Sequence, residues 1–291
     1  MRLTSCTSPA EFQRRAEPFL VQHEAENNLI LGILSGLVHS PGLYAERPYL
    51  ALGEDDAGAA VVAALRTPPF NLVLSLIPDE SARADAIALL AEVLRRKYGT
   101  LPGVTADSAS GRAFAEEWRR LTGEPYRVQV AERIYQLNRV VPVDGVPGTL
   151  RQATPDDRDL LIAWLDAFQK EAMPGSLETA ERLIDQLFTS SARRMYLWVD
   201  GEPVAMAGTS GQTPNGARVG PVYTPPTLRG KGYASACTAA LSQLLLDEGR
   251  RFCFLYTDLS NPTSNKIYQA IGYRPVCDAD MYAFGADSSA S

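Results

Sequence analysis

Helix-like and strand-like patterns of apolar residues follow one another in an order that occurs twice along the chain. In the first half, residues 8–37 carry an apolar stripe with helical spacing that includes Phe12, Phe19 and Ile30. Strand-like runs follow at residues 49–52, 58–67 and 70–76. Helical patterns then occupy residues 79–98 and 108–121, and a last strand pattern covers residues 127–137.

The second half repeats this order with different residues. Thr154 and Pro155, followed by acidic residues, predict the start of a helix over residues 156–168, and a second helix is expected over 177–189. Strands are expected at 195–199, 203–210 and 217–224. A helix over 231–248, a strand over 251–257, a short helix over 263–271 and a strand over 275–284 complete the pattern. The order predicts a duplicated α+β fold, with mixed helices and strands in each half.

Prolines and glycines interrupt every period between residues 135 and 155, so the sequence predicts a domain boundary there. We expect one domain over residues 1–145 and another over residues 146–291. A chain of 291 residues with 45% hydrophobic residues is long enough for two such domains.

Charge and composition exclude several classes of protein. A formal charge of −6 argues against a nucleic-acid partner, and no apolar run approaches the roughly 20 residues of a membrane span. The first residues do not resemble a secretory signal, so a cytoplasmic protein is expected. Four cysteines without CxxC spacing and only two histidines make a disulfide framework or a metal site unexpected. A homodimer is left open.

A glycine-containing turn stands at the start of the helix predicted over 231–248. The residues Arg229-Gly230-Lys231-Gly232-Tyr233-Ala234 follow a proline stop. Glycines let the backbone approach an anion, and free N–H groups at a helix start point outward together with the positive end of the helix dipole. This turn can hold a diphosphate. By itself it is equally well explained as a flexible connection between a strand and a helix.

A second motif downstream changes that balance. The stretch FLYTDLSNPTSNKIYQAIGYRP, residues 254–275, together with RGKGYA, resembles the acyl-CoA site of the GNAT superfamily of N-acyltransferases, and the resemblance covers residues 150–285. It implies that acetyl-CoA lies between the strands ending at Thr224 and Thr257, with its diphosphate on residues 229–235 and its pantetheine arm paired with residues 222–224. The residues implied to bind the cofactor are Val222, Tyr223, Thr224, Arg229, Gly230, Lys231, Gly232, Tyr233, Ala234, Ser235, Asn261 and Asn265.

The resemblance implies that Tyr268 is the general acid that protonates the departing CoA thiolate. A thiol pKa of about 8.5 and a phenol pKa of about 10 allow such a transfer. Tyr268 is alternatively a half-buried core aromatic residue with a solvated hydroxyl. Asn261 precedes Pro262 and is equally well explained as the N-cap of the short helix, whereas Asn265 lies one turn inside that helix.

The general base is not identified by the sequence. Glu171, Asp166 and Asp258 are candidates, each more typical of a solvated surface acid, and a chain of waters would leave no trace. Residues 168–177 join two predicted helices and include Met173, Pro174 and Gly175, a composition that suits a loop beside the acceptor.

The first half lacks an RGxG turn at the matching place. Pro78, Asp79 and Glu80 stand at the start of the helix over 79–98, and two acids would repel a diphosphate. We interpret residues 1–145 as a degenerate GNAT-like domain that shapes the acceptor site or a dimer contact. The alternative is an unrelated α+β domain.

The sequence leaves three candidate functions. The first is an N-acetyltransferase that moves an acetyl group from acetyl-CoA to a primary amine by direct attack, without a metal or a covalent enzyme intermediate, so that Cys237 and Cys253 are core residues. The second is a dinucleotide enzyme using Gly230, Gly232 and Asp258, but the glycines do not follow a strand directly and the acid comes too late. The third is a non-catalytic acyl-CoA sensor, which the presence of Tyr268 disfavours.

Overall fold

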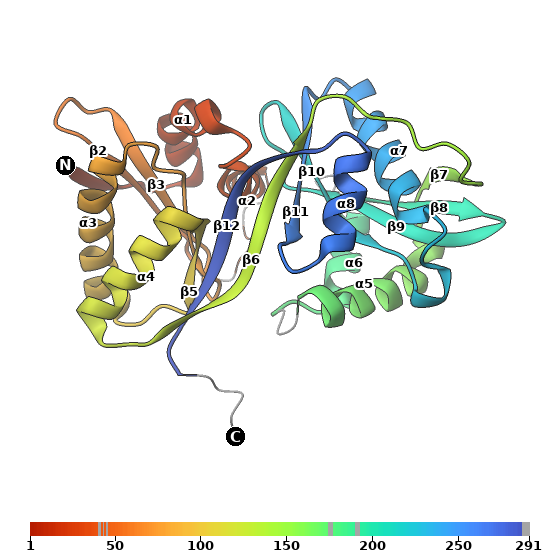
Figure 1. Ribbon diagram of the computed structural model, residues 1–291. Helices are drawn as coiled ribbons and strands as arrows, with labels where there is room; N and C mark the ends of the chain where they lie inside the picture. The colour runs from red at the N-terminus through yellow and green to blue at the C-terminus, as the bar shows by residue number, and fades with distance from the viewer. Residues whose placement is uncertain (40–41, 43, 45, 174–176, 190–192, 287–291) are drawn as a thin grey trace. The chain divides into compact units, whose positions relative to one another are not determined.

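The computed structural model describes residues 1–39, 42, 44, 46–173, 177–189 and 193–286 (Figure 1). They form two compact units. Unit 1 comprises Met1–Ile134 and Val276–Ser291, and unit 2 comprises Tyr135–Pro275. The chain enters unit 2 within strand β6 (Tyr126–Leu137) and returns to unit 1 within strand β12 (Arg274–Phe284).

These units differ from the predicted domains 1–145 and 146–291. The last strand of the chain belongs to unit 1, because β12 pairs antiparallel with β5 (Gly103–Asp107) from Ala279 opposite Asp107 to Ala283 opposite Gly103. Each such pair satisfies backbone N–H and C=O groups, so the strand is held by hydrogen bonds that its sequence position does not reveal.

Unit 1 is a sheet with helices on both faces. Its strand order is β1 (Arg2–Ser5), β2 (Tyr49–Glu54), β3 (Ala60–Arg66), β4 (Leu72–Leu74), β5, β12 and β6. Helices α1 (Pro9–Leu20) and α2 (Asn28–His39) pack on one face with Leu50 and Leu65. Helices α3 (Glu80–Tyr98) and α4 (Ser108–Thr122) pack on the other face with Ala51 and Ala64. Neighbouring residues therefore face opposite cores, as strand geometry requires.

The predicted helical stretch over residues 8–37 is divided in the structure. Helix α1 ends at Leu20, a short 3-10 helix η1 (Val21–His23) follows, and α2 begins at Asn28. The buried Asn27 amide donates to the Leu20 carbonyl, and its side-chain oxygen accepts from the Leu76 backbone N–H. These bonds satisfy the Leu20 carbonyl and the Leu76 N–H at the break between the two helices.

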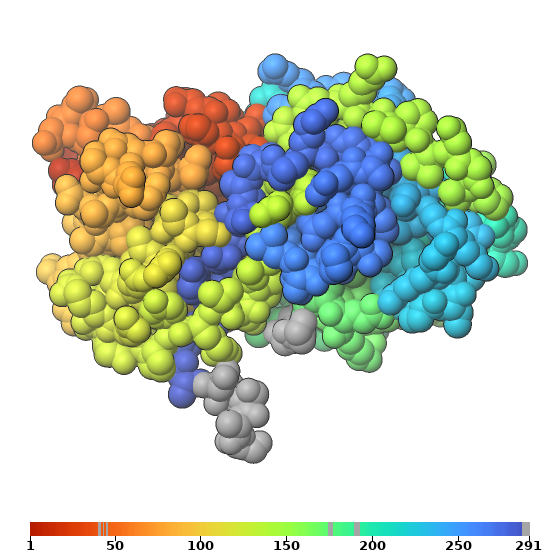
Figure 2. All heavy atoms as spheres, viewed as in Figure 1, coloured from red at the N-terminus to blue at the C-terminus, as the bar shows by residue number. Residues whose placement is uncertain are grey.

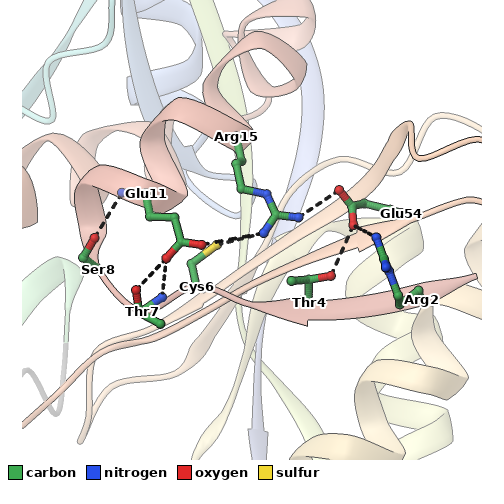
Figure 3. A network of polar contacts seen from close by, with 8 residues as sticks. All are labelled: Arg2, Thr4, Cys6, Thr7, Ser8, Glu11, Arg15 and Glu54. Carbon is green, nitrogen blue, oxygen red and sulfur yellow. Dashed lines mark hydrogen bonds and ion pairs between the residues drawn. The ribbon is translucent and has the colours of Figure 1, made fainter.

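A polar cluster ties β1 and α1 to β2 in unit 1 (Figure 3). The Glu54 carboxylate accepts hydrogen bonds from Arg2, Thr4 and Arg15 at 2.9–3.3 Å. The hydrogen bond from Arg15 is the largest cause of the lowered pKa of Glu54. Strand β1, which the sequence analysis did not predict, is thus held by side chains in addition to its pairing with β2.

Unit 2 repeats the arrangement of a sheet between two pairs of helices. From one edge its strands are β7 (Thr149–Gln152), β8 (Arg194–Asp200), β9 (Glu202–Ser210), β10 (Gly216–Tyr223) and β11 (Phe252–Asp258), with the end of β6 beside β11. Helices α5 (Arg158–Ala172) and α6 (Ala180–Thr189) pack on one face. Helices α7 (Tyr233–Asp247) and α8 (Pro262–Ala270) pack on the other face.

Helix α5 follows the 3-10 helix η2 (Pro155–Asp157), and the predicted N-cap at Thr154 is confirmed. Thr154 and Asp157 form a capping box, and Arg151 donates two hydrogen bonds of 2.7 Å to the Asp157 carboxylate. The bonds from Arg151 are the main reason that the pKa of Asp157 falls to about 2.

No helix within the described ranges has both the length and the apolar character needed to cross a membrane.

Candidate active site

Strands β10 and β11 begin as a parallel pair and then separate. Their register runs only from Gly216 opposite Phe252 to Arg218 opposite Phe254, although β10 continues to Tyr223 and β11 continues to Asp258. A bulge in β10 accompanies the separation. Val219 pairs with Thr209 and Val222 pairs with Ala207 on β9, so β10 contains one extra residue between the two pairs. The bulge includes Pro221, which has no N–H to donate to a neighbouring strand. Beyond Arg218, β10 stays paired with β9 on one edge, and its other edge, where it has separated from β11, is available to an extended ligand.

The predicted diphosphate turn follows directly. After β10 the chain forms the 3-10 helix η3 (Pro226–Leu228), and α7 starts at Tyr233 with Gly232 as its N-cap. Gly230 and Gly232 have φ angles of +79° and +84°, which favour glycine. Within the described chain, the backbone N–H groups of residues 230–235 have no hydrogen-bond acceptor. The turn thus presents consecutive free donors at the positive end of a 15-residue helix.

The side chains of this turn point to different partners. The Arg229 guanidinium donates to the Thr224 carbonyl at 2.9 Å and to both Glu171 carboxylate oxygens at 2.7 and 3.0 Å. Tyr233 is buried and donates to Asp200 at 2.6 Å, so only its backbone can serve the turn. The Lys231 side chain is exposed.

A buried hydroxyl stands at the end of β10. Thr224 is 8% exposed, and its hydroxyl oxygen has no partner among the residues that the structure describes. Two residues earlier, Val222 packs with the core that contains α7, whereas Tyr223 packs with α5 on the opposite face. Side chains alternate along a strand, so Thr224 is expected on the α7 side, together with the free N–H groups.

The asparagines predicted to contact the cofactor have local partners. Asn261 is the N-cap of α8 and accepts from the Ser264 N–H at 3.1 Å. The Asn265 amide donates to the carbonyls of Asp258 and Asn261 and accepts from the Tyr135 hydroxyl at 2.9 Å. Asn265 therefore connects the end of β11, the start of α8 and the end of β6. Contact of either side chain with a cofactor stays a prediction.

Tyr268 lies on α8, which has no fully buried residue and covers part of the surface of unit 2 (Figure 2). Its ring packs against the α7-side core and meets the Tyr273 ring edge-on, with centroids 6.1 Å apart. Burial raises the pKa of Tyr268 to about 12. The described chain contains several buried oxygens that lack a hydrogen-bond partner, and the Tyr268 hydroxyl is not one of them. This hydroxyl therefore keeps some contact with solvent. It is a neutral donor at ordinary pH.

The candidate bases are all engaged. Glu171 pairs with Arg229, and Asp166 pairs with Lys170 at 2.6 Å on the exposed side of α5. Asp258 accepts from the Ser260 N–H at 2.6 Å. The predicted acceptor loop, residues 168–177, lies partly outside the described residues, because 174–176 are not among them.

The cysteines of α7 and β11 lie in the core of unit 2. Cys237 and Cys253 are buried, and burial raises the pKa of each thiol to about 12, so both are inert core residues as predicted. Across the described parts of the chain, no group of three or more His, Cys, Asp or Glu side chains is placed to hold a metal ion.

Comparison with known proteins agrees with this arrangement. Two units in one chain, each with strands flanked by helices on both faces, form a tandem GNAT fold. Residues 159–273 match the model of the acetyltransferase (GNAT) family. This part of the chain belongs to the GNAT acetyltransferase family. Members of that family use acyl-CoA as co-substrate. No curated protein sequence matches the chain.

Solved structures resemble nearly the whole chain. A GCN5-related N-acetyltransferase from Kribbella flavida is 16% identical, with a TM-score of 0.59, over 89% of this chain and 96% of the other. One from Sphaerobacter thermophilus is 16% identical, with a TM-score of 0.59, over 99% and 98%. A tandem GNAT protein from the clavulanic acid biosynthesis pathway is 16% identical, with a TM-score of 0.56, over 98% of each chain. At such identities the likeness concerns the fold.

Sequence analysis missed three residues that shape the site. Tyr135 is fully buried and bonds Asn265 and Gln269, yet it lies in a strand pattern with no distinguishing neighbour. Asp200 lies between two predicted strands, with no pattern that marks it, and accepts the hydrogen bond from Tyr233. Val146 lies in the loosely patterned linker, and its side chain stands 2.8 Å from the position that a Cβ on Gly232 would take.

Proposed function

We propose that this protein is an N-acetyltransferase that moves the acetyl group of acetyl-CoA to a primary amine. The observation that carries the proposal is the run of free backbone N–H groups at residues 230–235, placed where β10 and β11 separate. Membership of residues 159–273 in an acetyltransferase family supports it.

The donors at this place suit the proposed co-substrate. Consecutive N–H groups at a helix start bind diphosphate oxygens without needing a charged side chain. The unpaired Thr224 hydroxyl adds a polar group at the strand end. Val222, Tyr223 and Thr224 would pair through their backbone with the amide groups of the pantetheine arm, as an added strand does.

In the proposed reaction the amine nitrogen attacks the thioester carbonyl carbon. A bond from nitrogen to carbon forms, the carbon–sulfur bond breaks, and the nitrogen loses one proton. Tyr268 gives a proton to the departing sulfur and recovers one from solvent. With a pKa of about 12, Tyr268 remains protonated throughout the physiological range. Because the CoA thiol has a pKa of about 8.5, proton transfer from Tyr268 is uphill. The Tyr268 hydroxyl therefore first donates a hydrogen bond that strengthens as charge develops on sulfur, and the proton follows as the carbon–sulfur bond breaks.

A base that receives the amine proton is proposed to be water. Each of the three carboxylates suggested by the sequence has a local partner in the structure, which reduces its availability. A primary amine that arrives unprotonated needs a base only after attack, when its proton is acidic.

Unit 1 is proposed to have lost cofactor binding. The helix in the matching position, α3, is capped by Asp79, whose carboxylate accepts hydrogen bonds from the Ser81 backbone N–H and hydroxyl at 2.8 and 2.7 Å. A carboxylate at this helix start competes with a diphosphate for the same N–H groups. The role of unit 1 in shaping the acceptor site or a dimer contact remains part of the proposal.

A non-catalytic acyl-CoA sensor is the second candidate. The raised pKa of Tyr268 and the engaged carboxylates favour it, because both weaken acid–base catalysis without affecting binding.

Thermal unfolding with acetyl-CoA, with NAD and without ligand tests binding, since a ligand of the native state raises its stability. We expect a higher Tm with acetyl-CoA alone. An equal shift with NAD contradicts the assignment. A thiol-release screen with acetyl-CoA against amines, amino acids, aminoglycosides and peptides then separates the enzyme from the sensor, which would bind acetyl-CoA and release no thiol.

A further inference from the structure

We infer that Glu171 and Arg229 act as a brace that positions the diphosphate turn, so that Arg229 is a positioning residue and not a ligand of the diphosphate. The inference rests on the proposed function, because it concerns the same turn. It changes the role that the sequence suggested for both residues, a cofactor contact for Arg229 and a candidate base for Glu171.

The donors of Arg229 are directed back to the protein. Its Nε donates to the Thr224 carbonyl at 2.9 Å, and one terminal nitrogen, Nη2, donates to both oxygens of Glu171. The guanidinium carbon also lies 5.7 Å from the centre of the Tyr223 ring. Three elements are thereby joined: the end of β10, the turn before α7 and the last turn of α5.

These contacts close a short ring of chain. The bond from Arg229 to Thr224 spans the segment that contains η3, where the Leu228 N–H bonds the Pro225 carbonyl and the Arg229 N–H bonds the Pro226 carbonyl. The free N–H groups begin at the next residue, Gly230. A fixed Arg229 therefore sets the direction in which these groups leave the turn, and preorganised donors bind more tightly than mobile ones.

The charge of the Arg229–Glu171 pair and its position on one face of the sheet support a positioning role for Arg229. The Glu171 carboxylate balances the guanidinium, so the pair presents little net positive charge to an anion. Tyr223 and α5 belong to the core on one face of the sheet, whereas α7 packs on the opposite face. The donors of residues 230–235 lie at the start of α7. The Arg229 guanidinium is thus held toward the opposite face of the sheet, away from these donors.

The experiment compares Arg229→Gln, Glu171→Gln and the double variant in the full chain. Acetyl-CoA dissociation constants are measured by calorimetry at low and high salt. Lys170→Gln is the matched control, because it removes the neighbouring exposed ion pair of α5 with Asp166. A brace predicts that Glu171→Gln weakens binding by about fivefold, the factor expected for one surface ion pair. Arg229→Gln weakens binding at least as much, because it also loses the bond to the Thr224 carbonyl. The double variant binds no more weakly than Arg229→Gln. The salt dependence stays that of the unaltered protein, and Lys170→Gln binds normally.

Two other results would overturn the inference. If Arg229 is a diphosphate ligand, Arg229→Gln weakens binding far more than Glu171→Gln and reduces the salt dependence, and Glu171→Gln binds as well as or better than the unaltered protein. If Glu171 is the base, Glu171→Gln retains its affinity for acetyl-CoA, lowers kcat by about a hundredfold and removes the acidic limb of the pH–rate profile.

A readout without ligand keeps the inference separate from the proposed function. In the absence of acetyl-CoA, both single variants should lower Tm, Arg229→Gln at least as much as Glu171→Gln, and the double variant should lose no more than Arg229→Gln. If the unaltered protein fails to bind acetyl-CoA, the proposed function fails, while this cycle still tests whether the two side chains are coupled. Additive Tm losses would show that they are not.

Discussion

Alanine at Gly232 should be far more damaging than alanine at Gly230, although both glycines lie in the same turn and have similar φ angles. A side chain at a positive φ costs about 1–2 kcal/mol, and part of this is offset by the lower entropy of the unfolded chain. Nothing lies within 4 Å of a Cβ at Gly230. We therefore expect Gly230→Ala to lower the free energy of unfolding by about 1 kcal/mol.

Gly232→Ala carries an additional steric cost. Its Cβ would lie 2.8 Å from Cγ2 of Val146, whereas carbon atoms in good contact are about 3.5–4.0 Å apart. Valine is restricted at χ1, so it cannot easily turn away, and overpacking of this kind costs typically 1–3 kcal/mol. The total loss for Gly232→Ala is therefore about 2–4 kcal/mol.

Urea unfolding measures these losses, and calorimetry with acetyl-CoA measures the effect on the turn. The double variant Gly232→Ala/Val146→Ala removes the clash and should lose less stability than the sum of its single changes. Both glycine variants should bind acetyl-CoA more weakly, because the N–H groups change direction. Equal stability losses at the two positions would refute the packing argument, and unchanged dissociation constants would refute the role of the turn.

Three other predictions concern single side chains. Tyr268→Phe should keep its affinity for acetyl-CoA and lower thiol release by about 10²-fold, and unchanged turnover would remove its role as acid. Asp157→Asn should cost about 2 kcal/mol at pH 7, because the pKa of Asp157 is lowered from 3.8 to about 2, largely by Arg151. This stabilisation is complete above pH 4 and is lost as the pH falls through 2. The free energies of unfolding of the variant and of the unaltered protein should therefore converge in acid. A difference between these free energies that is constant with pH would contradict the assignment. Thr224→Val and Thr238→Val should each raise the urea midpoint, because each change removes a buried unpaired hydroxyl. Only Thr224→Val should weaken acetyl-CoA binding. Equal effects of the two variants on binding would argue against a site at the end of β10.

Local patterns were enough to predict most elements. Helices α3 and α7 and strands β8 and β9 follow from periodicity over many residues, and Thr154 marks a helix start by its residue type. Three of the short strands were not predicted. Strands β1, β5 and β7 have four or five residues each, too few to show a period against their surroundings.

Contacts between distant residues could not be predicted. The placement of β12 in unit 1 depends on backbone pairing with β5, which any extended segment can make. The ion pair of Arg229 and Glu171 joins residues 58 positions apart, and both side chains are individually typical of a surface. The sequence indicated a glycine-containing turn before α7, which the structure contains. It did not indicate which side chains of this turn face the protein, because their partners are distant in the chain.

The most direct measurement of the central claim is an amide NMR titration of the full chain with CoA, with ADP and with pantetheine. If the backbone of residues 230–235 binds the diphosphate, their amide resonances shift with CoA and with ADP, and not with pantetheine. Pantetheine should instead shift the amides of residues 222–224. Amide signals of residues 230–235 that remain unchanged at saturating CoA would contradict the account.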